Sequence, residues 1–296
     1  CDWSSDVCSS DLFDYVAGTV WHGGLPYGDA FDTKPFGMLP ILWLSQTVFG
    51  DQMWSIRLME LGAILILGAA VGRAYRCLCA DGEAVGWGVS ALVTASYYFF
   101  SFDFWNTGQL ELWIGVLLIL SLCLLFNPAQ SPRAWLLAGM LAGWAFLIKF
   151  PACIPAAGIV GLRCVYVRHE CSSGCLQRVT RLLLWYSAGV GLTLTAMSIP
   201  IVLALGVSYV YEMYLVFLPY YARSALFDFK FYDFPISNWG PNLAIMTLFA
   251  LAFAKVVWSG RYAELRPVLG ILGLLCCAFA QVFAQGKFFA YHFVVL

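Results

Sequence analysis

Residues 182–206 read LLLWYSAGVGLTLTAMSIPIVLALG, twenty-five residues in a row without a charged side chain. An α-helix needs about 20 consecutive apolar residues to cross the hydrocarbon core of a bilayer, so this segment predicts a membrane-spanning helix. The composition of the whole chain agrees, because 61% of its 296 residues are apolar and only 11% are charged. Soluble domains carry about 25% charged residues. We therefore expect a polytopic membrane protein.

Similar apolar runs, separated by short polar turns, extend along the chain and predict an all-α, polytopic transmembrane helix bundle. We expect spans near residues 57–76, 84–101, 110–126, 134–150, 153–167, 182–206, 241–258 and 267–284. The aromatic run at 36–50 is too short to span and suits a helix lying in the membrane interface, as does the aromatic segment 207–240. The predicted bundle therefore has an outer loop with interfacial helices.

The basic residues divide between the two ends of the predicted spans. Ten lie in alternate connections, which the positive-inside rule assigns to the cytoplasm: Arg73, Arg76, Arg133, Arg163, Arg168, Arg178, Arg181, Lys255, Arg261 and Arg266. The opposite side has longer loops with both signs of charge, which is typical of a catalytic or binding face and equally of ordinary solvated loops. The net charge of the whole chain is -1, so a nucleic-acid partner is not expected.

Residues 1–12, CDWSSDVCSSDL, differ abruptly from the rest. They lack the basic start and apolar core of a signal peptide, and their back-translation resembles the end of a sequencing adapter. We interpret them as a foreign scar, with an ordinary polar tail as the alternative. Residues 13–296 are then one membrane domain. The last apolar run has only nine residues after Lys287, so we expect this domain to be truncated at both ends.

One polar stretch stands out on the predicted outer face. It places Asp29, Asp32 and Lys34 within six residues, beside the turn-forming Gly28 and Pro35. A carboxylate at the membrane surface can take a proton from a hydroxyl group, and a lysine can neutralise a phosphate. This combination suggests transfer chemistry on a phosphorylated substrate.

The motif around these residues resembles a known family. The sequence has Gly24-x-Pro26-Tyr27-x-Asp29, then Asp32-x-Lys34-Pro35, an apolar run that ends in Phe49-Gly50, and Arg57 at the start of a span. This pattern is similar to the first outer loop of GT-C membrane glycosyltransferases, especially bacterial relatives of protein O-mannosyltransferases and of the lipid A aminoarabinose transferase. Weaker similarities to the same family lie at residues 106–111, 147–151 and 286–292.

The resemblance implies transfer of a sugar from a polyprenyl-phosphate donor to an acceptor hydroxyl on the extracytoplasmic face, with inversion. The acceptor would be a glycan, a lipid or a protein, and no cofactor or metal is expected. The implied catalytic carboxylates are Asp29, Asp32 and Asp14; the implied donor-phosphate ligands are Lys34, Arg57, Lys149 and Lys287; possible substrate contacts are Tyr27, Glu111 and His292. Asp29 and Asp32 could instead cap turns or helices.

Two departures from the family pattern affect these assignments. Phe36 replaces the second proline of the family's K-P-P, which leaves Lys34 in place. The family's catalytic Asp precedes the residue matched by Tyr15 by four to six positions, so its place falls inside residues 1–12, where Asp11 stands at one such offset. If residues 1–12 are foreign, the chain is expected to lack the family's general base.

Other functions remain open at this point. A transporter or flippase would need ionisable residues near the middle of several spans, and the predicted spans are almost entirely apolar there. A membrane scaffold would leave the Asp29, Asp32 and Lys34 cluster without a role. Cys171 and Cys175 have a zinc-ligand spacing, but no second pair follows, so a structural zinc site is not expected. A lone histidine such as His22 is usually structural.

Overall fold

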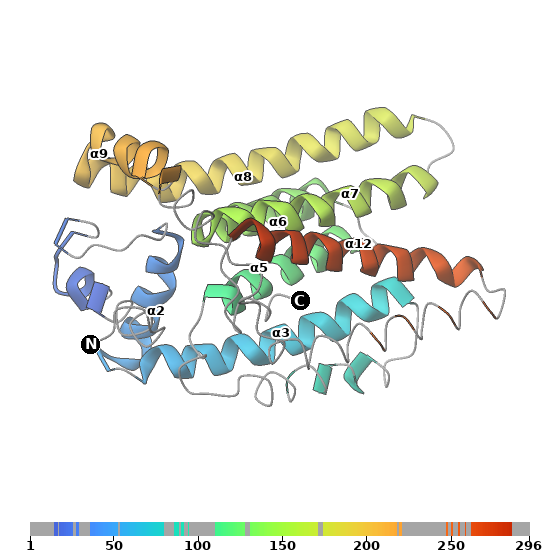
Figure 1. Ribbon diagram of the computed structural model, residues 1–296, viewed down its shortest axis with the longest axis horizontal. Coiled ribbons are helices and arrows are strands. Elements are labelled where there is room, and N and C mark those ends of the chain that lie inside the picture. The colour runs from blue at the N-terminus through green and yellow to red at the C-terminus, as the bar shows by residue number, and fades with distance from the viewer. Residues whose placement is uncertain are drawn as a thin grey trace.

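The chain folds into a bundle of long helices with shorter helices gathered at one end (Figure 1). The computed structural model describes residues 15–16, 18–25, 28–29, 36–52, 54–79, 86–88, 90–91, 94, 110–127, 131–170, 174–217, 219–220, 247, 250, 254, 258 and 262–285. Every regular element within these residues is a helix, which confirms the all-α prediction. The elements are η1 (Phe36–Met38), α2 (Leu39–Phe49), α3 (Ser55–Cys79), α5 (Leu110–Leu125), α6 (Pro132–Ile148), η3 (Phe150–Ala152), α7 (Cys153–Glu170), α8 (Cys175–Leu205), α9 (Val207–Tyr211), η4 (Glu212–Phe217) and α12 (Tyr262–Gln285).

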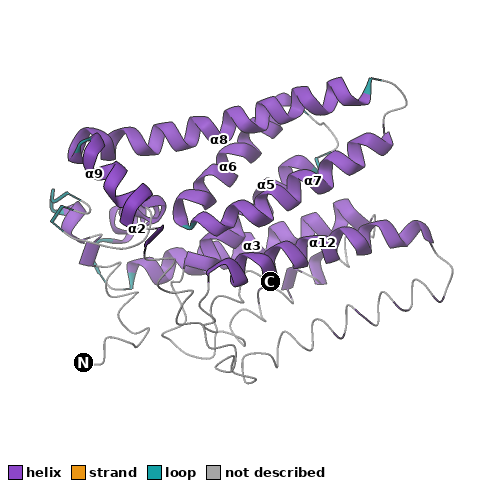
Figure 2. Cartoon of the chain, turned by 45° about the horizontal axis from the view of Figure 1, so that its top comes forward, coloured by secondary structure: helices purple, strands orange, loops and turns teal. Residues whose placement is uncertain are grey.

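The long helices run roughly along one axis, as Figures 1 and 2 show. α5 contacts α3 and α6, α6 packs against α8, and α12 packs against α7. η1 and η3 contact the end of α6, while α9 follows the C-terminus of α8. We call the end of the bundle that is formed by η1, α2, η3, α9 and η4 the α2 end.

The apolar core lies between α3, α5, α6 and α7. α5 is apolar all round, and its side chains are buried on most sides, with Ile114 fully buried and Leu112 nearly so. A helix that is apolar all round belongs in the centre of a bundle. Two hydrogen bonds also join α5 to its neighbours: Ser121 Oγ donates to the carbonyl oxygen of Ala138 at 3.1 Å, and Cys123 Sγ to that of Ala70 at 3.2 Å.

α6 and α8 pack backbone against backbone. A Cβ atom at Gly139 would overlap the carbonyl oxygen of Tyr186, and one at Gly189 would overlap that of Leu136. Small residues allow this close approach, which is how membrane helices commonly associate. We call these contacts, together with Gly143 against Val190, the glycine seam. The seam fixes where α6 lies, and therefore where its end lies.

Three described helices are long and apolar enough to cross a membrane: Ser55–Arg76, Phe150–Arg168 and Cys175–Leu205. They correspond to three predicted spans, and η3 lengthens the second of them, which the sequence predicted at 153–167. α5 and α6 have 16 and 17 residues and fall just below the usual range for a span. α12 covers the predicted span at 267–284. The predicted spans at 84–101 and 241–258 lie largely outside the described residues.

Candidate functional site

The turn around Asp29 is closed by Asp29 itself. Its carboxylate Oδ2 accepts a hydrogen bond from the backbone N–H of Leu25 at 2.7 Å, and its own N–H donates to the carbonyl oxygen of Leu25 at 2.9 Å. This short-range bonding is typical of an Asp in a turn. The structure therefore gives Asp29 the capping role that was one of its two predicted roles, on an exposed part of the chain.

The segment after Lys34 docks on the end of α6. Trp144 Nε1 donates to the carbonyl oxygen of Gly37 at 2.8 Å, across 107 positions of sequence. A Cβ atom at Gly37 would overlap the backbone of Leu147 and Ile148, so only glycine fits at this approach. η1 is therefore in direct contact with the end of α6, which leads to Lys149.

Four aromatic rings surround this junction. Phe36 lies edge-on to Tyr214 of η4, with ring centroids 5.7 Å apart, and its N–H donates to Tyr214 Oη at 3.4 Å. The ring centroids of Tyr214 and Phe150 are 5.9 Å apart, and those of Phe150 and Phe146 are 5.0 Å apart. Such pairs add to the stabilisation that comes from apolar burial alone. Three segments far apart in the sequence thus meet at the α2 end.

The central polar feature of the α2 end is an ion pair between Lys149 and Glu111. Lys149 Nζ lies 2.6 Å from Glu111 Oε1; the glutamate side chain is 1% exposed and the lysine side chain 22%. The two residues come from neighbouring antiparallel helices. Glu111 is in the first turn of α5, where the helix dipole favours negative charge. Lys149 caps the C-terminus of α6, where the helix dipole favours positive charge.

The residues around the Glu111–Lys149 pair are apolar. Leu110, Leu112 and Ile148 beside it are almost fully buried. A charge placed among such residues is strongly unfavourable unless it is paired. Glu111 therefore holds the ammonium group of Lys149 at one defined place at the C-terminus of α6. The sequence predicted both residues as site residues, but it contained no signal that they pair.

Arg57 lies in a different pair. Arg57 Nη1 is 3.6 Å from Glu60 Oε2 on the next turn of α3, and the two side chains are 19% and 5% exposed. α2 leads into α3 through Gly50, whose φ of 87° lies in the region that favours glycine. The start of α3 thus presents a second half-buried cation at the α2 end.

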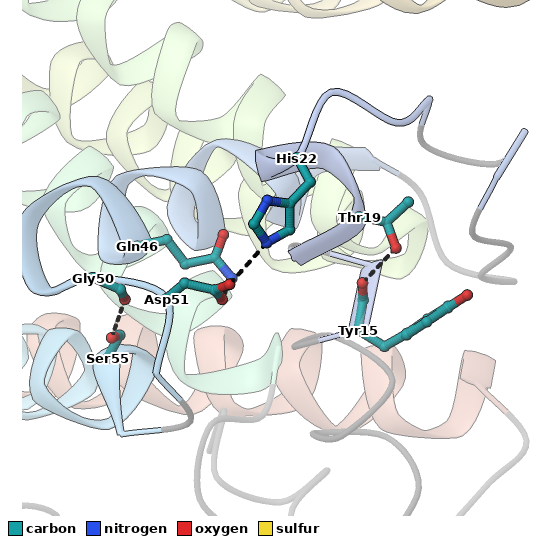
Figure 3. Close-up of polar contacts among 7 residues, drawn as sticks. All are labelled: Tyr15, Thr19, His22, Gln46, Gly50, Asp51 and Ser55. Carbon is teal, nitrogen blue, oxygen red and sulfur yellow. Dashed lines mark hydrogen bonds and ion pairs between the residues drawn. The ribbon is translucent and has the colours of Figure 1, made fainter.

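A third polar cluster was not predicted. His22 Nε2 lies 3.1 Å from Asp51 Oδ2, and Gln46 Nε2 donates to Asp51 Oδ1 at 3.4 Å (Figure 3). The histidine and aspartate side chains are 72% and 46% exposed. This cluster ties the turn after residues 18–21 to the junction between α2 and α3. A structural role for His22 agrees with the sequence analysis.

Several predicted site residues lie outside the described part of the chain: Asp14, Tyr27, Asp32, Lys34, Lys287 and His292. Their roles stay predictions. Within the described residues, no group of three or more His, Cys, Asp or Glu side chains could hold a metal ion. Of the ten predicted site residues, the structure brings together Glu111 and Lys149.

The comparisons with known proteins agree with the resemblance seen in the motif. Residues 33–169 match the model of the dolichyl-phosphate-mannose-protein mannosyltransferase family. This match covers just under half of the chain, and it shows that residues 33–169 are similar to that family. It extends from the segment just before Lys34 to the last turn of α7, and it includes Arg57, Glu111 and Lys149. No curated protein and no solved structure matches the chain.

Similarity to this family implies a GT-C membrane glycosyltransferase that depends on a dolichyl- or polyprenyl-phosphate sugar donor. The matched region contains η1, α2, α3, α5, α6 and α7, so the glycine-mediated docking of η1 and the Glu111–Lys149 pair both lie inside it. The Asp29 turn, α8 and α12 lie outside it. The family match favours the glycosyltransferase prediction over the transporter alternative.

Proposed function

We propose that this protein transfers a sugar from a polyprenyl-phosphate donor to an acceptor hydroxyl at the α2 end of the bundle, on the extracytoplasmic side, with inversion at the anomeric carbon. The observation that supports this most strongly is the half-buried Lys149, fixed by Glu111 at a helix end within the family region. A transferase with a lipid-phosphate donor gains from a fixed cation beside the donor phosphate, because negative charge develops there during transfer.

The proposed role of Lys149 follows from the charge that develops during the reaction. As the bond between the anomeric carbon and the phosphate oxygen breaks, negative charge builds up on that oxygen. An ammonium group already held in position lowers the energy of this transition state, because it need not reorganise. The leaving phosphate is a stable anion, so the residues of this chain can supply the electrostatic part without a metal.

Glu111 orients the ammonium group of Lys149 before the donor arrives. An ammonium group has three N–H donors, and Glu111 accepts one of them. The donor phosphate would then approach the exposed part of the Lys149 side chain, which is 22% exposed in all. In this proposal Glu111 is a positioning residue and Lys149 is a phosphate ligand, together with Lys34, Arg57 and Lys287.

The acceptor side of the reaction needs a carboxylate that removes the hydroxyl proton as the acceptor attacks the opposite face of the sugar. Asp32 and Asp14 are the proposed candidates. Asp29 is a weaker one, because one of its carboxylate oxygens already closes a turn. The acceptor is a hydroxyl of a glycan, lipid or protein.

The test is a transfer assay with the full-length protein in membrane vesicles and a labelled polyprenyl-phosphate sugar. Replacing Lys149 alone would strand the buried Glu111, so we pair the changes as Lys149→Met with Glu111→Leu. An apolar pair of similar size usually keeps the fold. We expect this variant to fold and to lose at least about tenfold in kcat/KM, which corresponds to about 1.4 kcal/mol of transition-state stabilisation. Lys34→Ala should show a loss of similar size.

Arg181→Ala is the matched control, because Arg181 is an exposed base at the opposite end of α8 and should not affect transfer. Wild-type rates in both the paired variant and Lys34→Ala would overturn the phosphate assignment. Movement of the labelled lipid across the membrane without any sugar transfer would favour the transporter alternative.

A further inference from the structure

A second buried polar group lies in α12, outside the family region. Gln281 is fully buried, and neither its Oε1 nor its Nε2 has a hydrogen-bond partner among the described residues. An amide side chain has two donors and an accepting oxygen, and leaving them unsatisfied in an apolar interior is destabilising. Buried polar groups without partners are rare in folded proteins, so each one needs an explanation.

The packing of α12 places Gln281 at the same end of the bundle as Lys149. α12 runs antiparallel to α7: Gly270 approaches Leu162, and Cys277 approaches Gly158 closer to the α2 end. Gln281 is one turn beyond Cys277 in the same direction, and α12 also contacts η3, the turn that follows Lys149. Figure 1 shows α12 ending toward the α2 end. The unpaired amide is therefore at the same end of the bundle as the Glu111–Lys149 pair.

The hydrogen-bonding groups of the amide indicate which part of the polyprenyl-phosphate sugar it could bind. The oxygens of an ionised phosphate only accept hydrogen bonds, so they could satisfy Nε2 but not Oε1. A sugar hydroxyl both donates and accepts, and two neighbouring hydroxyls can satisfy both ends of an amide at once. We propose that Gln281 binds hydroxyl groups of the donor's sugar, while Lys149 binds its phosphate. This inference rests on the proposed function, and it adds a sugar-binding residue on α12.

The experiment compares two ligands in the full-length protein: labelled polyprenyl phosphate, and the same lipid bearing its sugar. Gln281→Met replaces the amide with an apolar side chain of similar length. We expect it to raise the Kd of the sugar-bearing lipid by about threefold to tenfold, the range for loss of one or two neutral hydrogen bonds, and to leave the Kd of the lipid without sugar unchanged. The paired Lys149→Met and Glu111→Leu variant should weaken both ligands.

Thr193→Val is the matched control. Thr193 is another buried residue whose hydroxyl lacks a partner among the described residues, but it lies in the middle of α8, on the glycine seam. Removing an unsatisfied buried polar group should keep or raise the unfolding temperature in both variants. Only Gln281→Met should change the ratio of the two Kd values. That ratio is measured within one preparation, so a smaller folded fraction does not alter it.

Each outcome decides the proposal. An unchanged ratio in Gln281→Met overturns it and assigns the amide to an internal water. Equal weakening of both ligands also overturns it, because the amide would then bind the phosphate. If the wild-type protein binds neither lipid, the proposed function itself fails and the inference fails with it. If only the Lys149 variant loses binding, the proposed function stands and the inference alone is wrong.

Discussion

Helix α6 takes part in two regions of opposite character. Along its middle, the glycine seam presses its backbone against the backbone of α8, with no side chain between Gly139 and Tyr186. At its C-terminus, Trp144 and Lys149 make polar contacts to η1 and α5. The seam depends on the absence of side chains, and the α2 end depends on the identity of particular ones. The seam should therefore control stability, and the α2 end should control activity.

The largest effect is expected at the seam. Gly189→Leu would force a side chain into the carbonyl oxygen of Leu136, and such overpacking should cost about 3 kcal/mol or more. Gly191→Leu is the control on the same helix, because a Cβ atom at Gly191 would meet no neighbouring atom within 4 Å. Thermal unfolding in detergent should separate the two variants clearly. Equal unfolding temperatures would mean that α6 and α8 do not pack through this seam.

An intermediate effect is expected at the ion pair. Glu111→Ala leaves the ammonium group of Lys149 without its carboxylate, and breaking a buried pair costs about 3 kcal/mol. Glu111→Gln keeps the size and an accepting oxygen, so we expect a smaller loss of stability. Both variants should reduce sugar transfer more than Gly191→Leu does. An unfolding temperature in Glu111→Ala equal to that of the wild type would show that the pair is solvated.

The smallest effect is expected at the exposed cluster. His22→Ala removes a contact to Asp51 between side chains that are 72% and 46% exposed. Exposed pairs of this kind contribute at most about 1 kcal/mol, and salt screens them. The unfolding temperature should therefore change little, and any difference should vanish at high ionic strength. A large decrease in unfolding temperature that persists at high salt would show that His22 contributes to the stability of the core. The two regions would then differ less than proposed.

The sequence predicted the individual helices better than their contacts. The predicted span at 134–150 corresponds to α6, which begins after Ser131, whose Oγ accepts from the N–H of Ala134 at 3.2 Å. The apolar run of α8 is confirmed as a candidate span, although Pro200 lies inside the helix. Proline is tolerated in membrane helices because other groups satisfy the freed carbonyl. Local patterns of this kind can be read from a single sequence.

The candidate site was only partly predictable, for a physical reason. The family resemblance implied Lys34, Arg57 and Lys149 as donor-phosphate ligands, but the Glu111–Lys149 distance depends on how α5 and α6 pair. The bond from Trp144 to Gly37 joins residues 107 positions apart, and no periodicity signals it. Gln281 was missed because a glutamine in an apolar helix looks unremarkable until its burial and lack of partners are known. Each of these features depends on contacts between different helices, which the sequence alone does not specify.

The bond between Trp144 and Gly37 has a consequence for how the protein behaves in bilayers of different thickness. Membrane helices tilt when their apolar length and the bilayer do not match. Because η1 is fastened to α6 near its end, a tilt of α6 would carry η1 with it. The segment that follows Lys34 and the helix end at Lys149 would then move as one body. Changes in lipid composition would shift the site as a unit without pulling its two halves apart.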